Sequence, residues 1–312
     1  MAIRKRILDC TRSDFARMTA NELRYSILAA EGRTILAQAA ANHPPVIDQM
    51  TNIELDAGFG ADLIMINNYN FKHPEKNIGL SGFSLREMRA LIGRPIGIYF
   101  ECPADAESTA YDRPDRMTDP SARIASPENL EAAVEGGADF IVLGGNPGRG
   151  TTLETVIRST KLAREVVGDQ SMIWAGKWED GVVEKVIGDP LAEYDARDVV
   201  RRLIDAGADV VNLAAPGARH GITMEMIRSL AEVVHRHKPG TLVMSFLDSS
   251  VEGADEGTIR EIALLMKQTG ADIHAIGDAG YSGLALPENV YQLSLSIRGR
   301  RFTFRRMAAN NR

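Results

Sequence analysis

Short apolar runs recur along the chain, and four of them directly follow the tripeptide Gly-Ala-Asp. The tripeptides begin at Gly60, Gly137, Gly207 and Gly270, and the runs behind them are L-I-M-I, F-I-V-L, V-V-N-L and I-H-A-I. A glycine readily ends a helix, and an unbroken apolar run is typical of a parallel strand buried on both faces. The pattern therefore predicts four junctions at which a helix ends and a buried strand begins.

The spacing of these junctions leaves room for one more strand in each interval. The four aspartates lie 77, 70 and 63 residues apart (139 − 62, 209 − 139 and 272 − 209), which is too long for one βα unit and suits two. Four further apolar segments each follow a glycine within a few residues: 34–39, 95–101, 171–176 and 241–246. Eight βα units predict a closed (βα)8 TIM barrel, and an open doubly wound sheet is the alternative.

The chain divides into three parts on this interpretation. Residues 1–33 form an N-terminal helical extension, in which Thr19 and Glu22 make a capping box, and this helix could plug the bottom of the barrel. Residues 34–300 form the barrel. Residues 301–312 are a basic C-terminal tail, which we expect to be solvated or packed on a partner subunit. The repeated aspartates are expected to act as capping or turn residues for stability.

Composition and charge argue against several classes of protein. The net charge of −6 argues against a nucleic-acid partner, and no apolar run approaches membrane-spanning length. Only Cys10 and Cys102 are present, so no disulfide framework is expected. With no apolar signal segment at the N-terminus, these features predict a cytoplasmic protein. Whether it forms a homo-oligomer stays open.

Polar residues close several of the predicted strands, at the face where barrel enzymes carry their chemistry. The candidate catalytic residues are Glu101, Lys177, His220 and Asp248. A carboxylate that closes an apolar strand suits a general base, and a lysine beside a tryptophan suits an imine or a general base. The alternatives are structural: a salt bridge from Glu101 to Lys177 or an arginine, a lysine that only binds an anion, and a loop histidine without a catalytic role.

Two glycine-rich connections are candidate anion sites. Segment 272–283, D-I-H-A-I-G-D-A-G-Y-S-G, places the backbone of residues 277–280 where a phosphate or carboxylate could bind, and segment 144–150 is G-G-N-P-G-R-G. The alternative is a tight strand-to-helix connection. The predicted substrate-binding residues are Asn67, Asn146, Arg149, Asn212, Ser249, Gly277, Asp278 and Gly280. Ser250 is an alternative to Ser249.

Two further features bear on the predicted mouth of the barrel. Glu101, Asp248 and Asp278 could share a divalent metal, although the sequence contains no tight ligand motif, and the cofactor is otherwise unknown. The long polar loop 102–125 is expected to close over the mouth and exclude water.

The Gly-Ala-Asp strands, G-G-N-P-G-R-G and I-G-D-A-G-Y-S-G resemble an uncharacterised bacterial (βα)8-barrel family. That family is similar to the BtpA-like barrels and, more loosely, to phosphate-binding barrels such as the phosphoenolpyruvate mutase-like proteins. The resemblance covers residues 30–300 and implies a phosphate-binding barrel. The mutase-like lyases use an Asp-rich metal site and a Lys-x-Cys loop that this sequence lacks, so no catalytic residue is carried over.

These features favour an enzyme that acts on a small, anionic, phosphorylated or polyhydroxylated metabolite. A carbon–carbon lyase of the aldolase type, or an isomerase, fits best. Glu101 and Lys177 are predicted to face each other across the mouth, and Asp248 and Asp278 to complete a polar ring. A non-catalytic barrel that binds a ligand or serves assembly, and a flavin-binding barrel, are the alternatives.

Overall fold

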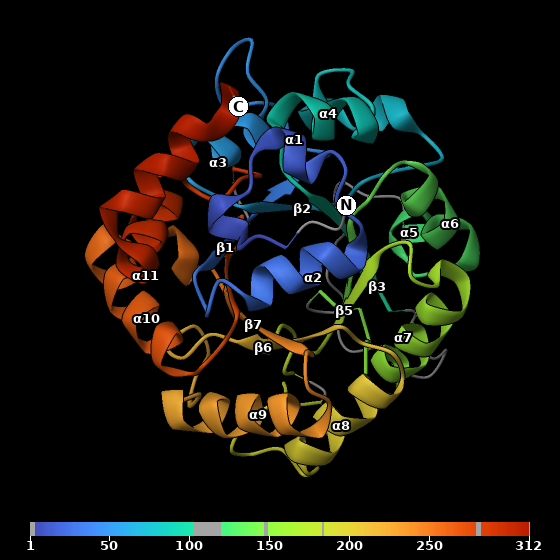
Figure 1. Ribbon diagram of the computed structural model, residues 1–312. Helices are drawn as coiled ribbons and strands as arrows, with labels where there is room; N and C mark the ends of the chain where they lie inside the picture. The colour runs from blue at the N-terminus through green and yellow to red at the C-terminus, as the bar shows by residue number, and fades with distance from the viewer. Residues whose placement is uncertain (1–3, 103–119, 147–148, 183, 279–281, 312) are drawn as a thin grey trace.

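The protein is a closed barrel of eight parallel strands in the order β1 to β8, with helices around it (Figure 1). The computed structural model describes residues 4–102, 120–146, 149–182, 184–278 and 282–311. The strands are Thr34–Ala40 (β1), Leu63–Asn67 (β2), Ile96–Glu101 (β3), Phe140–Gly144 (β4), Met172–Ala175 (β5), Val210–Ala214 (β6), Leu242–Leu247 (β7) and Ile273–Ile276 (β8). The predicted (βα)8 barrel is therefore confirmed. Because β8 pairs with β1, the open sheet is excluded.

The register of the strands has the stagger of a TIM barrel. Following paired residues once around the barrel from Ala40, through Asn67 on β2 and Val142 on β4, leads back to Gly32, eight residues before the start (40 − 32). A shear of eight in eight strands places the interior side chains in layers of four, drawn from alternate strands.

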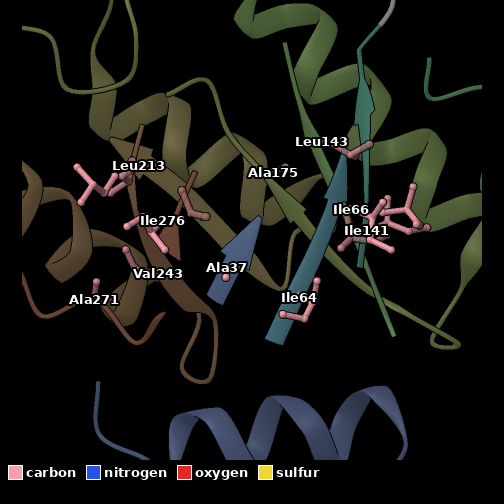
Figure 2. Close-up of a cluster of buried hydrophobic side chains, with 14 of the residues drawn as sticks. Ala37, Ile64, Ile66, Ile141, Leu143, Ala175, Leu213, Val243, Ala271 and Ile276 are labelled. Carbon is pink, nitrogen blue, oxygen red and sulfur yellow. The ribbon is translucent and has the colours of Figure 1, made fainter. Parts of the chain in front are cut away.

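Each strand buries one face against the helices and the other inside the barrel. The outward cluster includes Ile64 and Ile66 of β2 and Val243 of β7, which face the surrounding helices (Figure 2). The alternate residues, such as Met65 of β2 and Met244 of β7, belong to a second cluster that fills the interior. Both faces are apolar, as expected for a buried parallel strand.

The four helices before the Gly-Ala-Asp tripeptides each end two residues before the glycine, close to the predicted position. The helices are Arg12–Phe15 (α1), Ala20–Leu28 (α2), Asn52–Gly58 (α3), Leu85–Ile92 (α4), Pro120–Arg123 (α5), Pro127–Glu135 (α6), Leu153–Val167 (α7), Ala196–Asp205 (α8), Met224–His237 (α9), Glu256–Gln268 (α10) and Pro287–Met307 (α11). Short 3₁₀ turns occupy Ile7–Asp9, Pro74–Lys76, Ile78–Leu80, Val251–Gly253 and Ala308–Asn311. Within the described ranges, none of the helices combines the length and apolar character needed to cross a bilayer.

The N-terminal extension covers the end of the barrel at which the strands begin. Helix α2 starts at the predicted capping box of Thr19 and Glu22 and lies across the barrel opening in Figure 1. Its Leu23 and Ile27 are buried in the same cluster as the interior residues of the strands. The extension thus seals this end of the barrel. A candidate active site is therefore expected at the opposite end, where the strands finish.

The four repeated aspartates hold the strands together in pairs. Each carboxylate accepts a hydrogen bond from a backbone N–H at the start of the preceding strand: Asp62 from Ile35, Asp139 from Ile96, Asp209 from Ile173 and Asp272 from Val243, at 2.8–2.9 Å. Each also pairs with a basic side chain from a helix: Arg298 and Arg306, Arg89, Arg164 and His235, in the same order. The aspartates thus have a structural role, as predicted, but they act by linking neighbouring strands and not as capping or turn residues.

The basic C-terminus differs from the expected tail. Helix α11 runs through residue 301 to Met307, interrupted at Gly299 (φ 74°), and it does not end where the barrel was expected to end. Arg306 is buried, and its guanidinium pairs with Asp62 and donates to the carbonyl of Ile7. Arg306 is therefore part of the packed core at the sealed end, because the buried carboxylate of Asp62 requires its charge, while other residues of the segment such as Phe304 are exposed.

Candidate active site

Glu101 closes β3 and is surrounded by cationic and amide donors. Its Oε1 accepts hydrogen bonds at 2.8 Å from both Arg123 and Asn146, and Arg149 lies 3.5 Å from Oε2. The chain returns to β3 after α5, where the N–H of Ala125 donates to the Glu101 carbonyl, and this return places Arg123 at the mouth. Glu101 is thus an ion-paired carboxylate, as in the structural alternative with an arginine.

Lys177 has different partners from those expected. Its Nζ donates to the carbonyl of Glu184 at 2.7 Å and to the carbonyl of Asp180. The side chain is buried, and burial lowers the pKa of Lys177. Glu101 and Lys177 form no hydrogen bond or ion pair with each other, because each group is held by its own partners. Through these two hydrogen bonds, Lys177 instead stabilises the loop that follows β5.

Asp248 and Glu179 are two carboxyl groups with raised pKa values. Burial raises the pKa of Asp248 to about 7, although Arg219 and the Ser249 hydroxyl oppose the shift. Burial also raises the pKa of Glu179 well above its usual range, and repulsion by Asp248 adds to the effect. Arg219 Nη2 lies 3.8 Å from Asp248 Oδ2. The ends of β5 and β7 thus bring together two protonatable carboxyls and one guanidinium.

Trp178 packs inside the barrel against aromatic residues of β3 and β7. Its ring meets Tyr99 of β3 edge-on, with 6.1 Å between centroids, and lies 5.5 Å from Phe246 of β7. Gly144 of β4 makes room for the indole, since a Cβ there would stand 2.8 Å from Trp178 Cη2. The tryptophan is buried, and it forms an aromatic cluster with these two rings.

Three of the remaining predicted residues are buried or hydrogen-bonded, and His220 is neither. Asn67 is buried, and its Oδ1 accepts the N–H of Asn68, while Asn212 is buried inside the barrel. Ser249 donates to Asp248 from a backbone with φ 71°. His220 is exposed and makes no hydrogen bond or ion pair with the described residues.

The predicted anion site is only partly described. The N–H of Gly277 donates to the carbonyl of Leu247, so it serves the sheet and does not point to a ligand. Asp278 is partly buried, and it contributes to the raised pKa of Glu179. Ala279 and Gly280 lie outside the described residues, as does most of the predicted lid. The anion site at 277–280 and the lid stay predictions.

The predicted metal ligands do not form a ligand set. Among the residues that the structure describes, no three His, Cys, Asp or Glu side chains are grouped so that they could hold an ion. Glu101 is occupied by Arg123 and Asn146, whereas Asp248 pairs with Arg219. Within the described part of the chain, the donor set therefore does not fit the proposed metal.

Several residues at the mouth were not among the predicted site residues. Arg123 lies in the loop after β3, and Glu179 directly follows Trp178. Tyr99 precedes Glu101 by two residues, and the period of a strand places both on the same face. This spacing could have identified Tyr99 as a site residue. For Arg123, the only signal in the sequence was the abundance of arginine in the segment after β3.

The model of a family described as a domain of unknown function, DUF7916, matches residues 8–312. The chain belongs to the DUF7916 family. The comparison with curated proteins found no match.

Solved structures similar to this DUF7916 chain are other barrels. An archaeal fructose 1,6-bisphosphate aldolase is 14% identical, with a TM-score of 0.53, and the match covers 89% of this chain and 98% of that one. A pyruvate carboxylase from Rhizobium etli is 12% identical, with a TM-score of 0.52; the match covers 96% of this chain but only 30% of that one. A 2,3-dimethylmalate lyase of the PEP mutase/isocitrate lyase superfamily is 14% identical over 83% of this chain and 81% of that one, with a TM-score of 0.47.

These identities show a shared fold and leave the chemistry to this chain's own residues. The aldolase and pyruvate carboxylase matches carry the comparison, and they show the barrel fold alone. The resemblance to BtpA-like barrels stays a prediction.

Proposed function

We propose that this protein is a barrel enzyme that makes or breaks a carbon–carbon bond beside the carbonyl group of a small anionic substrate, or isomerises such a substrate. The observation that carries the proposal is the pair of carboxyl groups at the ends of β5 and β7. A pKa of about 7 for Asp248 lets that group both accept and release a proton at neutral pH. Shifted pKa values of this kind are concentrated at catalytic sites.

The two carboxyls have complementary roles in this proposal. Asp248, when ionised, takes the proton from a substrate hydroxyl or from the carbon next to the carbonyl. Glu179 has a pKa raised well above its usual range, stays protonated and donates to the carbonyl oxygen as negative charge develops there. Arg219 stabilises the same charge from its position 3.8 Å from Asp248.

The opposite side of the mouth provides positive charge for the anionic part of the substrate. Arg149 remains 24% exposed although it lies 3.5 Å from Glu101 Oε2. The carboxylate of Glu101 orients this arginine and Arg123 while leaving the Arg149 guanidinium accessible. In this assignment Glu101 is a positioning residue and not the general base.

Solvent deuterium exchange tests the proposal directly. In D₂O, the wild-type protein should exchange protons next to the carbonyl in at least one member of a panel of pyruvate, hydroxypyruvate and dihydroxyacetone phosphate, followed by NMR. Asp248→Asn should slow the exchange by at least about 100-fold. Asp209→Asn, the same change at the sealed end, should leave the rate unchanged.

Equal exchange rates in wild type and Asp248→Asn would refute the proposal. Binding of a panel member without any exchange, detected by thermal shift, would instead favour the non-catalytic binding protein.

A further inference from the structure

Three buried polar side chains inside the barrel have atoms that no group in the described structure satisfies. Gln38 of β1 is 5% exposed, and its side chain makes no hydrogen bond with the described residues. The Tyr99 hydroxyl on β3 and both amide atoms of Asn212 on β6 are buried without a partner, with the residues 2% and 0% exposed. None of the three is used by the proposed proton transfer.

All three side chains face the barrel axis. Tyr99 belongs to the interior cluster itself. Asn212 alternates with Val210 and Ala214, which are interior, while Val211 and Leu213 pack outward. Gln38 alternates in the same way with interior Leu36, because Ala37 and Ala39 pack outward. A strand period of two therefore directs the three polar groups inward.

The register places these groups at nearly the same depth. With a shear of eight, Gln38 and Tyr99 fall in one layer, and Asn212 lies in the next layer towards the sealed end. The remaining members of the Gln38 layer are Gly176 and Phe246, and the layer above contains Asn67, Gly144, Ala214 and Gly277. The layer between Gln38 and Tyr99 and the charged mouth thus contains three small residues, and the Trp178 ring packs beside one of them, Gly144.

A buried amide or hydroxyl without a partner opposes folding, so its presence calls for a role outside stability. Gln, Tyr and Asn side chains are neutral, and each can donate and accept a hydrogen bond. A substrate hydroxyl, which also does both, is the complementary group, whereas a phosphate or carboxylate suits the arginines at the mouth.

We propose that Gln38, Tyr99 and Asn212 form a hydroxyl-binding subsite that selects a hydroxylated keto compound over its deoxy analogue. The substrate enters with its hydroxyl-bearing end towards the sealed end, and its anionic group stays near Arg149. The inference deepens the proposed function, and it rests on that proposal for the location of the reaction.

Two matched pairs of probes test the subsite. Hydroxypyruvate and pyruvate differ by one hydroxyl, as do dihydroxyacetone phosphate and hydroxyacetone phosphate. Titration calorimetry should show that wild type binds the hydroxylated member of at least one pair at least about 10-fold more tightly. Asn212→Leu and Gln38→Met remove the polar groups at similar size, and each should bring the ratio close to one.

Asn212→Leu should also be more stable than wild type, because both amide atoms of Asn212 are fully buried without a partner. Removing this unsatisfied buried amide should raise Tm by about 2–4 °C for a domain of this size. Ser245→Ala provides the control, because Ser245 on β7 is also buried with an unpartnered hydroxyl but faces outward, between interior Met244 and Phe246. This variant should keep the wild-type binding ratio.

The outcomes separate the subsite from its alternatives. Equal affinities within both pairs in wild type, or no binding of any probe, would overturn the subsite. A preference that survives in both Asn212→Leu and Gln38→Met would do the same, since the amides would then contact only water. A preference lost in the variants, without deuterium exchange in wild type, would support the subsite while the proposed function failed.

Discussion

The strongest stability prediction concerns Asp62, which lies in a fully buried ionic cluster at the sealed end of the barrel. Its Oδ2 accepts from Arg298 at 2.5 Å and from the N–H of Ile35 at 2.9 Å, and its Oδ1 accepts from Arg306 at 2.6 Å. Burial by itself would raise the pKa of Asp62, but the two guanidinium groups and the N–H hold the pKa below its usual value. The carboxylate is therefore charged in the folded protein.

Asp62→Asn keeps the size of the side chain but removes the charge that two buried arginines share. Removing one partner of a buried ion pair costs about 3–5 kcal/mol, because the remaining charge is left in a low-dielectric interior. Asp209 is the matched control, since it makes the same backbone contact but its side chain is 23% exposed and its partner Arg164 27%. Solvent screening should limit Asp209→Asn to about 1 kcal/mol.

Urea denaturation of wild type and the two variants at pH 7 measures both costs as free energies of unfolding. In thermal unfolding, at about 2–4 °C per kcal/mol, Asp62→Asn should lower Tm by about 10 °C, and Asp209→Asn by only a few degrees. Equal losses in the two variants would refute the argument, because burial of the ion pair would then not determine its contribution.

Three further predictions test particular groups. Lys177 donates to two backbone carbonyls, so borohydride treatment with dihydroxyacetone phosphate should leave it unmodified in mass spectrometry, and an adduct on Lys177 would restore the imine. The deuterium-exchange rate should rise with pH through about 7 as Asp248 ionises, and should then level off; a rate independent of pH would remove Asp248 as the base. The Asp272 hydrogen bond raises the pKa of His235, so this pair stabilises the fold fully below pH 6.5, and the contribution is lost as pH rises through the folded-state pKa. Urea midpoints between pH 5.5 and 8.5 should show that loss in wild type and not in His235→Gln.

The fold could be predicted because its signal repeats and is local. A glycine ends each helix, and an aspartate follows that both begins one strand and binds the N–H of the preceding one, as Asp139 does with Ile96. Four pairs of neighbouring strands need this contact, so the same tripeptide occurs four times. Arg298 and Arg306 carry no such local signal, because their partner Asp62 lies 236 and 244 residues away in sequence. A basic segment whose counter-charge is this distant looks like a solvated tail.

The site was harder to predict because side-chain direction depends on parity. In a strand buried on both faces, the apolar pattern does not show which alternate residues enter the barrel. Trp174 is interior, so the period of two that continues beyond β5 brings Trp178 inward and leaves Lys177 on the other side, next to the loop. The same parity joins Glu101 to Tyr99 on β3. If one interior residue of each strand were known, the period of two would show which side chains reach the mouth. That information comes from the register of the closed barrel and not from composition or spacing.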